Sequence, residues 1–240
     1  MCANYRPVTR MDRMLTFFGV ERLQGDFAEA EAWPSALVPF IRLKPASEGL
    51  APNERLVLDA AIWRVVPDFV TAQVWAKNTF NARSEELMQK STYRPLWKAG
   101  QRCIIPAEWF FEPRYFGTVE KPGKSERWRI QKVGGVPLGI AGIYRRFVDE
   151  KTGEITHTMG MLTCNADTHP VMQQFHRPGD EKRMPVILDP EQYMEWLTCT
   201  PDEAQLLCKQ WHGPLEAFAD AAAPRRRKAE PPDGGQEPML

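Results

Sequence analysis

The second residue of the chain is a cysteine, and this position gives it specific chemical options. We expect Met1 to be removed in the cell, because it precedes a small residue, so that Cys2 becomes the mature N-terminus. Its α-amine and thiol would then lie on adjacent carbons. An α-amine has a reference pKa of about 8, against about 10.4 for lysine, so much more of it is unprotonated at neutral pH. Such an amine condenses with an aldehyde, and the thiol then closes a five-membered thiazolidine ring in an intramolecular step.

One aldehyde of this kind is the ring-opened form of an abasic site on a DNA backbone. A cysteine at position 2 is weak evidence by itself, because chance accounts for most such placements. The interpretation therefore depends on other parts of the chain that could bring proton-transferring and phosphate-binding groups to Cys2.

Four further segments support the interpretation. They are Ile62-Trp63 with Val66-Pro67, Asn81 to Glu85, Arg102 to Ala107 continuing to Phe110-Phe111-Glu112, and His176 followed by Arg183 to Leu188. With Cys2 at the start, these motifs resemble the SRAP (SOS response-associated peptidase) family of abasic site processing proteins. The resemblance spans about residues 2 to 188 and implies capture of abasic sites in DNA.

The resemblance implies a catalytic role for four residues. Cys2 matches the family's nucleophile, and Asn81 matches an amide that orients the α-amine or holds the opened sugar. Glu112 matches a carboxyl group that shuttles protons during sugar opening and imine formation. His176 matches a histidine that donates or accepts a proton in the same steps.

These assignments have alternatives. Asn81 is also a suitable turn or capping residue before a short helix, and Glu112 could be a surface carboxylate of a strand. Glu108 is the rival of Glu112, and His169 is the rival of His176.

Two arginines match family positions that bind the phosphates flanking the lesion, where a bidentate guanidinium contact suits the geometry. They are Arg83 and Arg183. The alternative is that these arginines pair with carboxylates of the chain itself.

The sequence also departs from the family. In the N-terminal motif, Ala3-Asn4-Tyr5 replaces Gly-Arg-Phe, and the six residues 177–182 stand where one is usual. These changes predict a reshaped DNA-binding surface. Arg64, Trp75 and Lys77 are hypothetical replacements for the lost contacts.

Composition is that of an ordinary globular protein. The chain has 240 residues, 43% of them hydrophobic, which is enough for one domain with its own core. Lys and Arg number 31, as do Asp and Glu, so the neutral net charge argues against a polybasic coating protein but allows a local basic groove. We find neither an apolar run of about 20 residues nor a secretory leader. We therefore expect a cytoplasmic monomer, nucleoid-associated when bound to DNA.

The five cysteines argue against a disulfide framework or a zinc site, because their number is odd and no C-x-x-C pair exists. Apart from Cys2, we expect small buried or helical residues at Cys103, Cys164, Cys199 and Cys208. No His and Asp cluster has the spacing of metal ligands, so we expect no metal and no other cofactor.

Apolar periodicity and turn signals predict an α+β fold with an antiparallel-rich sheet and few helices. We expect helices over 9–20, capped by Thr9 with Asp12, over 84–89, and after Asp189-Pro190 and Thr200-Pro201. The expected strands are 56–66, 102–106, 108–112, 126–132, 137–144, 155–163 and 183–188. The resemblance implies a single SRAP-like domain with a curled, barrel-like sheet. We expect it to cover residues 1–220, followed by a disordered polar tail at 221–240.

Three functional hypotheses remain. The first is covalent capture of abasic sites in single-stranded or junction DNA, with weak lyase activity when ring closure fails. The second is a peptidase or autoprotease with an N-terminal cysteine nucleophile. The third is a non-covalent reader of modified or single-stranded DNA, with Trp and Arg side chains stacking on bases. Dependence on Cys2 separates the first two from the third.

Overall fold

The computed structural model describes residues 2–20, 27, 30–44, 55–67, 79–148 and 152–220. Its strands are β1 (Tyr5–Pro7), β2 (Leu37–Leu43), β3 (Leu56–Trp63), β4 (Asn81–Arg83), β5 (Arg102–Tyr115), β6 (Ser125–Lys132), β7 (Leu138–Val148), β8 (Ile155–Asn165), β9 (Arg183–Pro185), β10 (Ile187–Leu188) and β11 (Leu215–Ala219). Its α-helices are α1 (Met11–Phe18), α2 (Arg94–Lys98), α3 (Tyr193–Thr198) and α4 (Pro201–Leu207). No helix in this part of the chain is long and apolar enough to cross a membrane. The expected tail, 221–240, lies outside the described residues.

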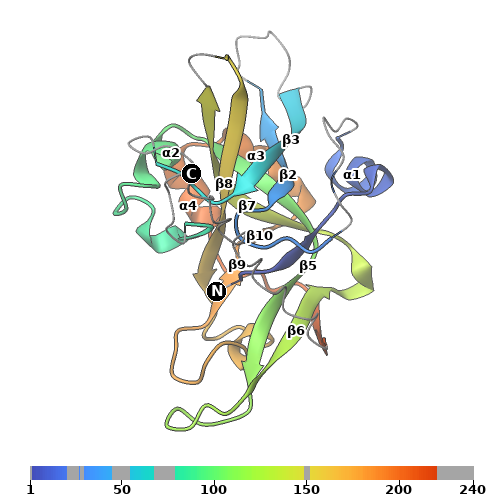
Figure 1. The fold of residues 1–240 in the computed structure, drawn as a ribbon, viewed down its shortest axis with the longest axis vertical. Coiled ribbons are helices and arrows are strands. Elements are labelled where there is room, and N and C mark those ends of the chain that lie inside the picture. The colour runs from blue at the N-terminus through green and yellow to red at the C-terminus, as the bar shows by residue number, and fades with distance from the viewer. Residues whose placement is uncertain are drawn as a thin grey trace, which may run out of the picture.

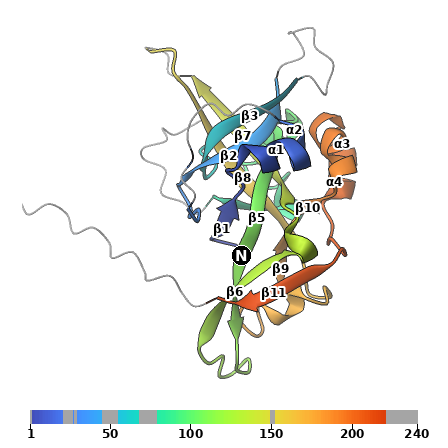
Figure 2. The ribbon, with the colours of Figure 1, turned by 90° about the vertical axis from the view of Figure 1, so that its right-hand side faces the viewer.

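Five strands close into a barrel, in the order β7, β8, β3, β2, β5 and back to β7. All neighbours in this ring are antiparallel except β3 and β8, which run parallel. Beyond the barrel, β5 continues into a hairpin with β6, and β11 pairs with the outer edge of β6. This hairpin projects away from the barrel (Figure 1). Helices α3 and α4 lie together on one side of the barrel (Figure 2). The predicted α+β class with a barrel-like sheet is confirmed.

Large aromatic side chains fill the interior. Trp63 and Trp196 are 0% exposed and Trp97 is 2% exposed. The indole N–H of Trp63 donates to the Phe80 carbonyl at 3.0 Å, and that of Trp196 donates to the Cys103 carbonyl at 2.9 Å. Because a buried indole N–H without a partner would be costly, these bonds explain how the core accommodates such residues. These tryptophans are core anchors.

The longest strand corrects one prediction. Residues 102–106 and 108–112 are parts of one strand, β5, which continues to Tyr115. Pro106 was expected to separate them, because proline has no N–H for a sheet. Its carbonyl oxygen, however, still accepts a hydrogen bond from the Val8 N–H at 3.1 Å, and it stays in register opposite Gly139. The strand therefore passes through the proline and extends from the barrel into the hairpin.

The two C-terminal helices begin where the capping residues predict. The Thr200 hydroxyl accepts from the Glu203 N–H at 3.3 Å, and the Glu203 carboxylate accepts from the Thr200 N–H at 2.8 Å. This reciprocal pair is a capping box. At the preceding helix, Pro190–Gln192 forms a short 3-10 turn that leads into α3. The prediction of helices after residues 189 and 200 is confirmed.

The earlier helices differ from their predictions. The first spans Met11–Phe18 rather than 9–20, and its N-cap residue is Arg10, not Thr9. Asp12 instead binds the Arg10 guanidinium at 2.6 Å, and Gly19, with φ of 68°, ends the helix in the left-handed conformation that glycine allows. Only Ser84–Glu86 is helical in the predicted 84–89 helix, and it is a 3-10 turn.

Close strand contact requires a glycine at the junction of β5, β7 and β8. Gly142 lies opposite Cys103 on one side and Met161 on the other. A Cβ at this position would lie 2.8 Å from the Cys103 sulfur and 2.9 Å from Ile105 Cδ1. We predict that Gly142→Ala lowers the free energy of unfolding by about 1–3 kcal/mol because it overpacks the barrel. Urea unfolding measures this, with exposed Glu126→Ala as the control, and an unchanged midpoint would contradict it.

Candidate active site

Segments far apart in the sequence meet along one edge of β5, where it leaves the barrel. The Phe111 N–H donates to the Asn4 carbonyl oxygen at 3.0 Å, which fixes the N-terminal segment beside the strand. Two residues further, the Pro113 carbonyl oxygen accepts from the His176 N–H at 2.8 Å. Both bonds lie on the edge of β5 that faces away from β6, because residues two apart in a strand direct their backbone groups to the same side. The N-terminal end of the chain lies at this edge in Figure 1.

Cys2 lies three residues before the start of β1 and is 1% exposed. The side-chain Nδ2 of Asn81 donates to the Cys2 carbonyl oxygen at 2.6 Å, and the Tyr93 hydroxyl donates to the Asn81 carbonyl oxygen at 3.1 Å. Asn81 is the first residue of β4, which pairs in parallel with β8. Its side-chain oxygen is buried without a hydrogen-bond partner among the described residues. This oxygen is therefore the group of Asn81 that is available to accept a hydrogen bond from a ligand.

Glu112 and His176 lie next to each other on the same side. Glu112 is 1% and His176 7% exposed, and Nε2 of the histidine is 3.7 Å from Oε2 of the carboxyl group. Burial raises the pKa of Glu112 to about 7 and lowers the pKa of His176 to about 4. Burial, and then the negative charge of Glu112, raise the pKa of the Cys2 thiol. At neutral pH the site therefore holds a thiol, a neutral imidazole and a carboxyl group that both gives and takes protons.

The backbone at His176 is strained. Its φ is 64°, and among the described non-glycine residues only Ser35 shares a positive φ. Such a conformation costs about 1–3 kcal/mol and persists where the surroundings impose it, often at functional sites. At this position the backbone bond to β5 imposes it, and the turn directs the ring to Glu112.

The two rival residues have other partners. Both carboxylate oxygens of Glu108 accept from the Arg13 guanidinium, at 2.8 and 2.7 Å. In His169, Nε2 lies 2.8 Å from the Trp211 carbonyl oxygen and Nδ1 accepts from the Met172 N–H at 3.1 Å. These contacts stabilise local structure, so the geometry favours Glu112 and His176 for the site.

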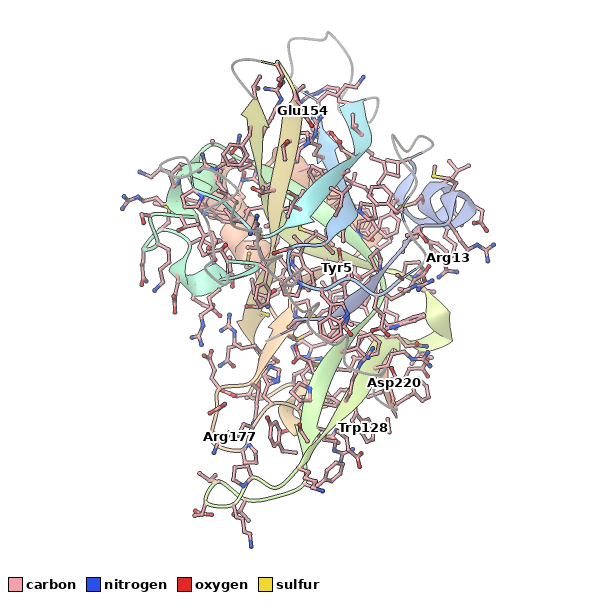
Figure 3. All side chains as sticks on the ribbon, in the orientation of Figure 1. Tyr5, Arg13, Trp128, Glu154, Arg177 and Asp220 are labelled. Atoms are coloured by element: carbon pink, nitrogen blue, oxygen red, sulfur yellow. The ribbon has the colours of Figure 1, made fainter. Side chains whose placement is uncertain are left out.

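A cavity of about 630 Å³ opens beside His176. Its other walls come from the β5–β6 hairpin, from Arg83, and from the loop that precedes β9; they include Pro113, Tyr115, Arg177, Gly179, Asp180, Glu181 and Arg183. Arg177, at the outer end of this loop, is labelled in Figure 3. The volume is in the range of pockets that hold small ligands.

The two candidate phosphate-binding arginines differ in exposure. The Arg83 side chain is 40% exposed and pairs with Glu181 at 2.8 Å. The Arg183 side chain is 3% exposed and binds Glu85 at 2.8 Å and Glu181 at 2.7 Å. It also donates to the Thr163 carbonyl oxygen at 2.7 Å. For Arg183, this favours the alternative of pairing with carboxylates of the chain, whereas Arg83 is accessible to a ligand.

The hypothetical replacement contacts are only partly described. Arg64 follows β3 and is half-buried, and its backbone N–H donates to the Ile62 carbonyl at 2.8 Å. It is not among the residues that line the cavity beside His176. Trp75 and Lys77 lie outside the described residues.

Two contributors to the site were not found from the sequence. Tyr93 supports Asn81, and Glu181 bridges the two arginines. The first lies between recognised motifs, and the second lies in the segment 177–182, where no family pattern gave a residue a role. No sequence signal identified either contact.

The remaining cysteines have structural positions. Cys103 and Cys164 are buried in strands, and Cys199 and Cys208 follow the last residues of α3 and α4. All five cysteines are free thiols. In the described part of the chain, no three His, Cys, Asp or Glu side chains are grouped as metal ligands would be.

A barrel in which a cysteine near the N-terminus of the chain is buried beside a carboxyl group and an imidazole fits the class of protein that the sequence motifs resemble. The sequence profile of this class, described as SOS response associated peptidase (SRAP), matches residues 1–219. The chain therefore belongs to the SRAP family.

Individual relatives agree with this. Abasic site processing protein YoqW of Bacillus subtilis is 27% identical over 225 residues, which are 91% of each chain. YobE of the same organism, also named an abasic site processing protein, is 30% identical over 86% of this chain and 88% of its own. A crystal structure of a Bordetella bronchiseptica protein is 31% identical, with a TM-score of 0.77 over 92% of this chain and all of that one. A Bacteroides thetaiotaomicron structure, 20% identical, shares the fold with a TM-score of 0.68 over 91% of each chain.

Proposed function

We propose that the chain captures abasic sites in DNA covalently, as a thiazolidine on Cys2. One observation carries the proposal: Cys2, Asn81, Glu112 and His176, which are distant in the sequence, meet at one edge of β5. The names of the relatives, abasic site processing proteins, support the class of substrate.

Single-stranded DNA is the preferred partner. The opened sugar must rotate out of the DNA helix to reach a residue as buried as Cys2. An abasic site has no base to unpair, so the cost lies in distorting the backbone between the flanking base pairs, and it is lowest where the neighbouring nucleotides are single-stranded. The same argument favours the ends of duplexes and strand junctions over continuous duplex.

The reaction has two bond-forming stages. Removal of Met1 converts the nitrogen of Cys2 into a free amine, which attacks the aldehyde carbon C1′ of the opened sugar. The carbonyl oxygen gains protons and leaves as water, giving an imine. The Cys2 sulfur then bonds to the same carbon, and its proton passes to the nitrogen as the ring closes. One water is released, and no oxidant or reductant is needed.

The neighbouring groups supply the proton transfers. With a pKa of about 7, Glu112 carries protons from the attacking amine to the departing oxygen as the imine forms, and then carries the proton that the sulfur loses to the nitrogen as the ring closes. The neutral His176 hydrogen-bonds to the sugar oxygens as the ring opens, since its lowered pKa keeps it uncharged. Asn81 positions residue 2 through its bond to the Cys2 carbonyl.

The imine has a second outcome. If the sulfur does not add, loss of a proton from C2′ lets the bond to the 3′ phosphate oxygen break, and the strand is cleaved. This elimination gives weak lyase activity. It is slow relative to ring closure because the thiol lies on the same residue as the amine.

Asn81→Ala is predicted to slow adduct formation about 10- to 100-fold, because the Cys2 carbonyl loses its hydrogen bond and residue 2 its orientation. The measurement is single-turnover formation of a denaturant-stable adduct with an abasic oligonucleotide. Exposed Gln174→Ala, on the turn before His176, is the control and keeps the wild-type rate. A wild-type rate in Asn81→Ala would assign the asparagine to folding alone.

The same oligonucleotide tests the two competing hypotheses. A non-covalent reader would bind it equally with and without Cys2 and would leave no adduct after denaturation. A peptidase would cleave members of a peptide panel in a Cys2-dependent manner. Wild-type protein that forms no stable adduct would reject the proposal.

A further inference from the structure

One carboxylate bridges the two arginines of the candidate site. Oε2 of Glu181 lies 2.8 Å from Nη1 of Arg83, and Oε1 lies 2.7 Å from Nη1 of Arg183. An anion held between two guanidinium groups is the arrangement in which proteins bind phosphate. The positions of the Glu181 oxygens are thus positions in which phosphate oxygens could be bound.

The two arginines contribute unequally to this arrangement. Arg183 keeps a bidentate partner in Glu85 and a bond to the Thr163 carbonyl, so its position does not depend on Glu181 alone. Arg83 is 40% exposed, and among the described residues it has one further, longer ion pair, 3.6 Å to Glu86. Glu181 is therefore the principal anionic partner of the exposed arginine.

The loop that carries Glu181 forms one wall of the cavity beside His176. Its turn is closed by the Arg177 carbonyl, which accepts from the Asp180 N–H at 3.1 Å and from Lys182 Nζ at 2.7 Å. Gly179, with φ of 84°, lets the loop approach Val119 of the β5–β6 connection, since a Cβ there would lie 3.1 Å from Cγ1 of that valine. The loop thus holds its carboxylate at the cavity rather than in bulk solvent.

We propose that Glu181 is an internal competitor for the DNA phosphate next to the lesion. In the free protein its carboxylate occupies Arg83, and on binding, the phosphate takes its place while Arg183 stays anchored by Glu85. This inference rests on the proposed function for the identity of the anion. Glu181 therefore sets how tightly the site holds DNA without taking part in the chemistry at Cys2.

The competition has a signature in the salt dependence of binding. A phosphate bound by a free arginine releases a condensed counterion, which gives a slope of log K against log salt of about −0.7 per contact for a single strand. When the arginine must first leave Glu181, the freed carboxylate takes up a cation from solution, and this offsets the release. Removing the carboxylate should steepen the slope by up to about 0.7 and tighten binding at low salt.

The test uses a single-stranded oligonucleotide that contains tetrahydrofuran, an abasic analogue without an aldehyde. Binding is then measured independently of any covalent step. For Glu181→Gln we expect about five-fold tighter binding at low salt and a steeper salt slope, in fluorescence anisotropy titrations at several salt concentrations.

Asp180→Asn is the matched control. It removes one negative charge from the same loop and the same cavity wall, but within the described residues Asp180 has no ion pair with either arginine. Affinity and slope close to wild type are expected. If Glu181→Gln fails to fold, Glu181→Asp keeps the charge of the loop but is one methylene too short to bridge both arginines, and about two-fold tighter binding is expected.

If Glu181→Gln and Asp180→Asn change the affinity and the salt slope equally, the effect comes from the net charge of the loop and the inference is overturned. Wild-type affinity or weaker binding in Glu181→Gln would overturn it as well. Failure of the proposed function gives a different result, because wild-type protein would then form no adduct with a true abasic site whatever its affinity for the analogue.

Discussion

A Cys2→Ala variant is expected to lose the denaturant-stable adduct with abasic DNA, a decrease of at least about 100-fold, because no thiol remains to close the ring. Its free α-amine is retained once Met1 is removed. The variant should therefore still form an imine that borohydride reduction traps, and it should cleave the strand more than the wild type does. The loss of the stable product with retention of the imine separates the role of the sulfur from that of the nitrogen.

The measurement is denaturing electrophoresis of the protein with a labelled oligonucleotide carrying one abasic site, with and without reductant. Cys199→Ala, at a half-buried cysteine after α3, is the control and should behave as wild type. Because Cys2 is buried, Cys2→Ser serves as a second variant that preserves the size of the side chain. A stable adduct of wild-type yield in either Cys2 variant is incompatible with a thiazolidine.

Glu112→Gln is expected to slow adduct formation by about 10²–10⁴-fold while stabilising the fold. The loss of rate follows from removing the group that transfers protons. The gain in stability follows from burial, which raises the pKa of Glu112 to about 7 from its ordinary value of 4.5. Between these pH values the native state keeps a proton that the unfolded state releases. Wild-type stability therefore falls as pH rises from about 4.5 through 7, and stays lower above it.

The size of this effect is about 3 kcal/mol, since each pKa unit corresponds to about 1.4 kcal/mol. Thermal unfolding at pH 5 and pH 8 should show Glu112→Gln more stable than wild type mainly at pH 8. Glu108→Gln is the control on the same strand, because Glu108 is paired with Arg13 and belongs to no part of the site. A Glu112→Gln variant that is active, or less stable than wild type at pH 8, would contradict this assignment.

Local signals predicted those parts of the fold that are determined locally. Thr200 and Pro201 begin α4 because capping and a proline at the first helical position act within one turn. In contrast, β2 and β11 were not predicted. Their registers depend on distant partners, as when Leu215 pairs with Lys132. Pro106 was misinterpreted for the same reason. Whether a strand can contain a proline depends on whether a neighbouring strand needs the missing N–H as a donor, and this follows from the fold and not from the local sequence.

The motifs identified four residues that the fold brings together, but sequence could not give their protonation behaviour. The pKa shifts of Glu112 and His176 arise from burial, which depends on the packing of β1 and of the turn at His176 against β5. Likewise, both arginines matched phosphate-binding positions, and only the structure distinguishes the accessible Arg83 from the buried Arg183.

The most direct test of covalent capture by Cys2 is the intact mass of the protein, alone and after mixing with an abasic oligonucleotide. We expect a protein that lacks Met1, and then a species whose mass is the sum of protein and oligonucleotide minus one water. Retention of Met1, or a protein mass unchanged by abasic DNA, would contradict it.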